Sequence, residues 1–130
     1  MIVETNNSAA LEKKYNFYDV EVVKNKFEVH AIKKSKNGNQ YLFVIYNGLF
    51  WWDADLFDII DNNTPEYWIN KSFGRFGKLK NKQYDFSIDI SEFTGPKELI
   101  ENTNFLFDIY EYPSVAFQFF CDVIKKYRNV

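Results

Sequence analysis

The side chains that most often carry enzyme chemistry are scarce in this sequence of 130 residues, which contains one histidine, His30, and one cysteine, Cys121. Nucleophilic, redox and transition-metal mechanisms usually need several such side chains held together. His30 has no second histidine or cysteine nearby, which is typical of a packed or surface imidazole. Cys121 falls on the apolar face of a predicted C-terminal helix, where a small apolar residue packs well. We therefore expect no enzyme activity, no catalytic residue and no cofactor.

Carboxylates are the remaining candidates for chemistry. Asp53-Ala54-Asp55 resembles the acidic pair with which some nucleotide-sugar transferases hold a divalent cation. Acids one residue apart are common, however, and 130 residues leave no room for the nucleotide-binding domain of such enzymes. The string also lacks the pattern of a calcium loop. We expect no metal site, whereas a pair of acids acting on a glycoside stays open, because the sequence does not show which acids lie together in space.

Charge is segregated along the chain more strongly than the net charge of −2 suggests. One acidic block runs from Asp53 to Glu66 and a second from Asp85 to Glu111. Basic residues gather around an early hairpin and in a later loop. The hairpin group comprises Lys24, Lys26, Lys33, Lys34 and Lys36. Such blocks are often solvated faces, but they also steer and select charged partners.

The acidic blocks and the tryptophans beside them predict a surface that binds a protein. Acidic side chains attract a basic partner, and exposed tryptophan is a frequent anchor in protein interfaces. The predicted partner-binding residues are Trp51, Trp52, Asp53, Asp55, Asp58, Asp85, Asp89 and Glu92.

A basic loop supports an alternative hypothesis, that the protein is an accessory factor that binds nucleic acid. Residues 71–82 interleave cations with phenylalanines that could stack on bases. The residues of this alternative site are Arg75, Phe76, Lys78 and Lys80. The pI near 5.4 is opposite to the usual charge of such domains, so we favour a protein partner.

The fold that must position these residues is predicted to be α+β, because strands come first and helices mostly later. We expect an antiparallel sheet of four to five strands with N-terminal hairpins, packed by short helices and a C-terminal helix. Residues 1–13 are expected to form a flexible arm, and residues 14–130 a single domain. The longest nearly apolar run, Tyr41 to Trp52, is too short to span a membrane.

Strands are predicted from alternation and from turn signals. The predicted strands are 15–23, 27–34, 41–46 and 84–90, with a tight reversal at 24–26. Asn37-Gly38 predicts a type I′ hairpin turn, since both residues accept positive φ. The unbroken apolar run 41–46 suits a central strand that is covered on both faces.

Segment 84–90 has the clearest alternation in the chain. Tyr84, Phe86 and Ile88 should face the core, and Asp85 and Asp89 should share the outer face. These acids could then contact a partner without emptying the core. The preceding loop, 72–82, is expected to be mobile, because its glycines and like charges resist packing.

Helices are predicted mainly in the second half. A hydroxyl followed by proline at 64–65 favours a short helix over 65–71. Another short helix should span about 97–102, and the last should begin at Pro113 with a broad apolar stripe. Segment 49–62 is ambiguous, with strand followed by helix favoured, and 105–112 fits either structure.

Two strings give the chain a likeness to a known class of proteins. They are Pro65-Glu66-Tyr67-Trp68-Ile69, between predicted strands, and Phe119-Phe120-Cys121-Asp122-Val123-Ile124-Lys125-Lys126, in the last helix. With the acidic composition and a 20% content of Phe, Tyr and Trp, they resemble the small immunity proteins of bacterial polymorphic-toxin systems, including contact-dependent growth inhibition. The resemblance implies a cytoplasmic protein that binds one cognate secreted toxin, often a nuclease with a basic cleft, in a one-to-one complex.

Overall fold

A computed structural model describes residues 1–6, 10, 13–14, 26–74 and 77–128 of the chain. The strands of this part are β1 (Ile2–Thr5), β2 (Lys26–Glu28), β3 (Ile32–Ser35), β4 (Gly38–Ile45), β5 (Gly48–Asp53), β6 (Phe57–Asp61), β7 (Trp68–Ser72), β8 (Lys78–Leu79), β9 (Ile88–Asp89) and β10 (Glu92–Pro96). The helices are α3 (Lys97–Glu101), α4 (Phe105–Glu111) and α5 (Pro113–Arg128), with a short 3-10 helix, η1 (Ala54–Leu56).

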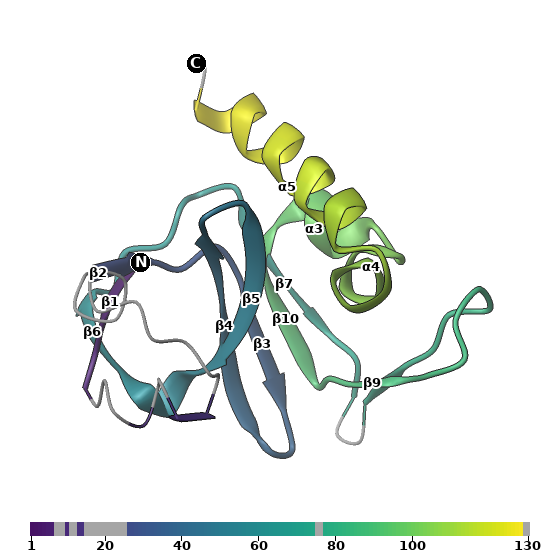
Figure 1. Ribbon diagram of the computed structural model, residues 1–130, viewed down its shortest axis with the longest axis horizontal. Helices are drawn as coiled ribbons and strands as arrows, with labels where there is room; N and C mark the ends of the chain where they lie inside the picture. The colour runs from purple at the N-terminus through teal and green to yellow at the C-terminus, as the bar shows by residue number, and fades with distance from the viewer. Residues whose placement is uncertain (7–9, 11–12, 15–25, 75–76, 129–130) are drawn as a thin grey trace.

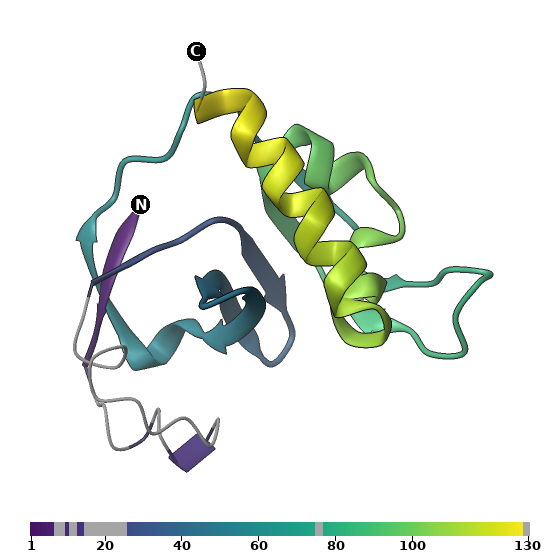
Figure 2. The same cartoon turned by 45° about the horizontal axis from the view of Figure 1, so that its top comes forward.

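The predicted α+β class is confirmed. An antiparallel sheet with the order β5-β4-β3-β10-β7 forms the middle of the molecule, with α3, α4 and α5 on one side of it (Figure 1). A smaller sheet with the order β2-β1-β6 lies on the other side, and Figure 2 shows the same separation from a second direction. None of the described helices is long and apolar enough to cross a membrane.

Strand β4 is central and covered on both faces, as its apolar run predicts. Leu42 and Val44 contribute to a first core, shared with the helices. Phe43 and Ile45 contribute to a second core, shared with the smaller sheet. Because successive side chains of a strand point to opposite faces, one strand helps to fill both cores.

The hairpin between β3 and β4 is confirmed, but its predicted turn type is wrong. Ser35 pairs with Gly38, and Gly38 has a φ of 116°. Asn37 does not share the positive φ that a type I′ turn requires of both central residues. Within this turn, Gly38 is the residue with a positive φ, and a glycine accepts this value because it has no Cβ.

The first residues of the chain belong to a sheet, so the expectation of a flexible arm over 1–13 is wrong for Ile2–Thr5. Strand β1 lies between β2 and β6, and Val3 is fully buried in the second core. A single buried valine in a four-residue strand is too weak a sequence signal to reveal this. The predicted strand 15–23 and the reversal at 24–25 lie outside the described residues.

The predicted strand 27–34 is divided between the two sheets. Val29 lies in the second core and Ala31 in the first, so residues 29–31 carry the chain across. The His30 amide donates to the Leu42 carbonyl at 2.9 Å, and the Leu42 amide donates to the Ala31 carbonyl at 2.9 Å. The crossing therefore stays hydrogen-bonded to β4.

Two segments predicted to be helical are strands. The favoured helix after residue 55 is limited to η1, and Phe57–Asp61 pairs with β1 as β6. Residues 65–67 form a turn, and Trp68–Ser72 pairs with β10 as β7. Aromatic and β-branched residues favour strands where a partner strand is available, and the sequence did not reveal these partners. The helices α3 and α5 are confirmed, and 105–112 resolves as α4.

Candidate functional site

A cavity of about 330 Å³ lies where strands β3, β4 and β5 meet β9 and α4. The side chains that give it chemical character are Lys33, Gln40, Asp53, Phe86, Asp89 and Tyr110. We call it the Lys33 cavity. Its residues come from distant parts of the chain, so the fold assembles a site that no local motif encodes.

Asp53 enters the cavity wall from the end of β5. Its carboxylate accepts a hydrogen bond from Gln40 Nε2 at 3.1 Å and forms an ion pair with Lys14. Asp55, its partner in the acidic pair, is exposed on η1. Among the described residues, no three His, Cys, Asp or Glu side chains form a group that could hold a metal ion.

Asp89 reaches the cavity from β9. Only Ile88 and Asp89 of the predicted strand 84–90 form a strand, which pairs with β8. The longer strand is therefore wrong, because the described part of the chain supplies only Lys78 and Leu79 as a partner. The predicted alternation of burial is confirmed, since Asp85 is exposed whereas Ile88 is buried.

Residues 84–87, which precede β9 and are not part of a strand, are held in place by aromatic contacts. The ring of Tyr84 stacks on Phe107 with centroids 5.0 Å apart, and Phe86 packs on the same ring at 5.3 Å. The Tyr84 hydroxyl donates a hydrogen bond to Asp108, which raises the pKa of Tyr84 to about 12. These contacts orient Asp85 outward without a strand ladder.

Lys33 is the unusual residue of the site, because its side chain is only 5% exposed. Its Nζ donates a hydrogen bond to Tyr110 Oη at 3.2 Å and lies 4.8 Å from the centre of the Trp51 ring. No carboxylate oxygen of the described residues lies within 4 Å of it. Burial lowers the pKa of Lys33 to about 8. Aromatic faces therefore take the place of a counter-ion.

Sequence reasoning missed Lys33 because it grouped this residue with the basic hairpin. A signal was present, since Ala31 and Lys33 are two residues apart and side chains at this spacing share a strand face. Ala31 has the small apolar side chain of an inner face, and it is fully buried. The same alternation places Lys33 on the inner side of the sheet.

The tryptophans predicted to contact a partner are buried. Trp52 is 1% exposed in the second core, and Trp51 is 8% exposed in the first core, beneath Lys33. Neighbouring strand residues point to opposite faces, and here both faces are covered. The exposed aromatic residues nearby are instead Tyr110, at 53%, and Phe50, at 38%.

Two hollows adjoin the Lys33 cavity and extend it into a groove. One shares Gln40 and Tyr110 with the cavity and includes Phe50. The other shares Phe86 with the cavity and is lined by Asp85 together with Lys80 and Lys82. We call this surface the groove, and its defining residues are Phe50, Asp53, Asp85, Phe86, Asp89 and Tyr110.

Three of the predicted acids lie outside the groove. Asp55 is exposed on η1, and Asp58 on β6 accepts a hydrogen bond from Asn6 Nδ2 at 3.2 Å. Glu92 forms an ion pair with Lys34 at 3.6 Å. The structure thus brings Asp53, Asp85 and Asp89 together and separates these three from them.

The described part of the basic loop combines one tightly packed glycine with exposed lysines, and the mobility of the loop stays a prediction. Gly77 fits tightly, since a Cβ at this position would lie 1.9 Å from the carbonyl oxygen of Ile90. Lys78 is exposed in β8, and Lys80 is exposed just after it. Arg75 and Phe76 of the alternative nucleic-acid site lie outside the described residues.

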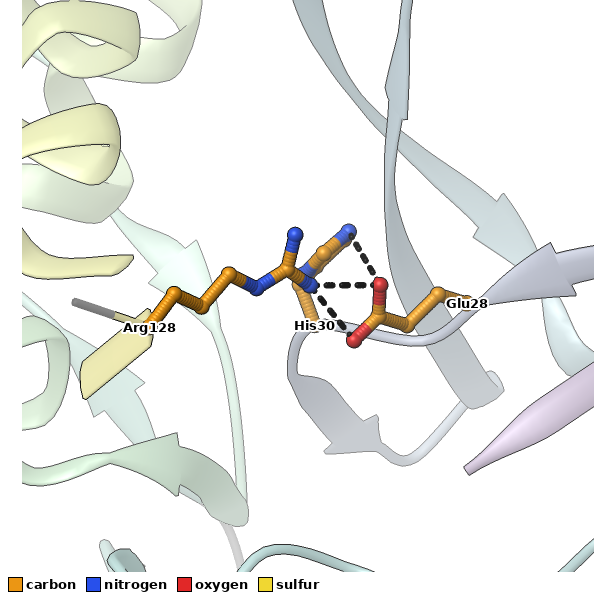
Figure 3. Close-up of polar contacts among 3 residues, drawn as sticks. All are labelled: Glu28, His30 and Arg128. Atoms are coloured by element: carbon orange, nitrogen blue, oxygen red, sulfur yellow. Dashed lines mark hydrogen bonds and ion pairs between the residues drawn. The ribbon is translucent and has the colours of Figure 1, made fainter. Parts of the chain in front are cut away.

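His30 is packed between the sheet and the last helix (Figure 3). Its ring meets that of Phe120 edge-on, with centroids 5.0 Å apart, and its Nε2 lies 4.0 Å from a Glu28 oxygen. Arg128 donates hydrogen bonds to both oxygens of Glu28, at 2.6 and 2.7 Å. Burial lowers the pKa of His30 to about 4. Cys121 packs against the first core, and burial raises the pKa of its thiol.

No protein-family model, curated protein or solved structure matches this chain. A proposal for its function therefore depends on the chemistry of the groove and on the composition of the chain.

Proposed function

We propose that the protein is an immunity protein that binds a basic, secreted protein toxin through the groove and neutralises it in a one-to-one complex in the cytoplasm. The supporting observation is that Asp53, Asp85 and Asp89 border one concave surface together with exposed aromatic side chains. Acids along a concave wall suit a projecting lysine or arginine of a partner.

The groove combines the two ingredients that such binding needs. Carboxylates raise the rate of encounter with a basic protein and set its orientation. Tyr110 and Phe50 offer apolar area with few rotatable bonds, and aromatic residues of this kind dominate the energy of many interfaces. Tyr110 is held by the Lys33 hydrogen bond, so its position costs little further ordering when a partner binds.

A toxin that acts on nucleic acid is the partner class that this surface suits best. Such enzymes bind phosphates in a basic cleft, and the carboxylates of Asp85 and Asp89 present negative charge in a similar way. The likeness to immunity proteins in composition and in the two sequence strings supports the same partner. The inhibitor would act by occupying the cleft rather than by chemistry of its own.

Growth protection tests this function. We expect a toxin domain to be encoded beside the gene. Expressed in a susceptible bacterium, this domain should stop growth, and the wild-type protein should restore it. Reversing the groove charges by Asp85→Lys with Asp89→Lys should abolish protection. The matched control, Asp58→Lys with Asp61→Lys, makes the same charge change on exposed residues of β6 and should still protect. Full protection by the groove variant at normal abundance would contradict the proposal.

A further inference from the structure

Lys33 places a primary amine at the wall of a cavity large enough for a small molecule, and no carboxylate of the described residues is bound to this amine. We propose that the Lys33 cavity is a ligand site in which Lys33 forms a reversible imine with a small, non-anionic aromatic aldehyde or ketone. The inference is independent of the proposed toxin partner, because the cavity and its amine need no second protein.

The proposed reaction starts from the unprotonated amine of Lys33, the form that burial favours. Lys33 Nζ loses a proton to solvent, attacks the carbonyl carbon and forms a carbinolamine, which expels one water to give a carbon–nitrogen double bond. Water reverses the reaction, and no oxidant or reductant takes part. Burial lowers the pKa of Lys33 to about 8, so a larger fraction of this amine is unprotonated near neutral pH than of an exposed lysine.

The walls define which carbonyl compound fits. Phe86 and Tyr110 line the cavity and offer faces to a planar ring, and about 330 Å³ lies at the lower end of the range for ligand sites. Asp89 lines it as well and repels anions, while Asp53 in the same wall is paired with Lys14. The expected ligand is therefore a single aromatic ring that carries a carbonyl group and hydrogen-bond donors, without a phosphate or a carboxylate.

Two aldehydes that differ in one phosphate make the test sharp. The folded protein is incubated with pyridoxal or with pyridoxal 5′-phosphate, the imines are reduced with cyanoborohydride, and the modified lysines are located by peptide mass spectrometry. Labelling of Lys33 is expressed relative to exposed Lys36, which corrects for the intrinsic reactivity of each reagent. We expect this ratio to be about tenfold higher with pyridoxal, because the phosphate is repelled by Asp89.

Variants separate a cavity reaction from adventitious labelling. Lys33→Arg should remove the preferred adduct, whereas Lys34→Arg should keep it, since Lys34 is exposed and paired with Glu92. Asp89→Asn should raise the Lys33 ratio measured with pyridoxal 5′-phosphate. Circular dichroism before reduction confirms that each sample is folded. A Lys33 that stays unmodified, or that reacts equally with both reagents, would overturn the proposal.

Discussion

Lys33 and His30 are both buried, and the structure meets the cost of burial differently for each. Lys33 keeps a hydrogen bond to Tyr110 and two aromatic faces around its amine. His30 packs on Phe120 and is neutral, because burial outweighs the attraction of Glu28 for its charged form. At the scale of single residues, burial lowers the pKa of both side chains, but Lys33 lines a cavity whereas His30 is a packed structural contact.

His30 should make stability depend on pH. Its pKa is about 4 in the folded protein and near 6.5 in the unfolded chain, so only the unfolded chain takes up this proton between these values. The free energy of unfolding should fall by about 3 kcal/mol from this group as pH drops from 7 to 4, and this contribution should level off below pH 4.

Two measurements check this prediction. His30 is the only histidine, so its imidazole resonances in an NMR titration report a single site. Urea unfolding at pH 7 and pH 5 should show a smaller loss of stability in His30→Gln than in the wild type. A histidine that titrates near pH 6.5 in the folded protein would show that it is not buried against Phe120.

At the scale of elements, the short β8–β9 ladder positions Asp89. The Ile90 amide donates to the Gly77 carbonyl at 3.0 Å, and this contact brings the two backbones together next to the ladder. Side chains cannot fit at Gly77, because the carbonyl of Ile90 occupies the place of a Cβ. A glycine that looks like a loop residue in the sequence is therefore needed for the wall of the Lys33 cavity.

Gly77→Ala should lower the free energy of unfolding by about 2 kcal/mol, the usual cost of forcing an extra carbon into packed surroundings. It should also speed hydrogen exchange at the Ile90 amide. Gly48→Ala is the control, because its added Cβ would meet the end of the Phe50 ring at 3.0 Å, and this side chain can move. Equal effects of the two substitutions would contradict the tight packing at Gly77.

The sequence predicted those features that depend on the pattern of apolar residues within one segment. The alternation of 84–90, the apolar run of β4 and the stripe of α5 all place the expected side chains in the cores. The failures are segments whose structure depends on a distant partner. Leu56, Ile59 and Ile60 have helical spacing, but β1 pairs with residues 57–61 and makes them a strand.

At the scale of the whole molecule, the groove exists because the β4–β5 hairpin serves two cores and carries Asp53 at its end. Helix α4 then brings Tyr110, and the segment before β10 brings Asp85 and Asp89, to the same edge. Sequence reasoning named these acids among its candidates, but it could not separate them from Asp58 and Glu92. That distinction depends on pairing between strands far apart in the chain.

The most direct test of the account is the affinity of the purified toxin domain for the wild-type protein and its charge variants, measured by calorimetry and by association kinetics at several salt concentrations. We predict tight binding that weakens by roughly 2–5 kcal/mol in Asp85→Lys with Asp89→Lys, with association that slows as salt increases. Asp58→Lys with Asp61→Lys should bind like the wild type. Unchanged affinity in a groove variant with a normal thermal melt would contradict the claim that the groove receives the toxin.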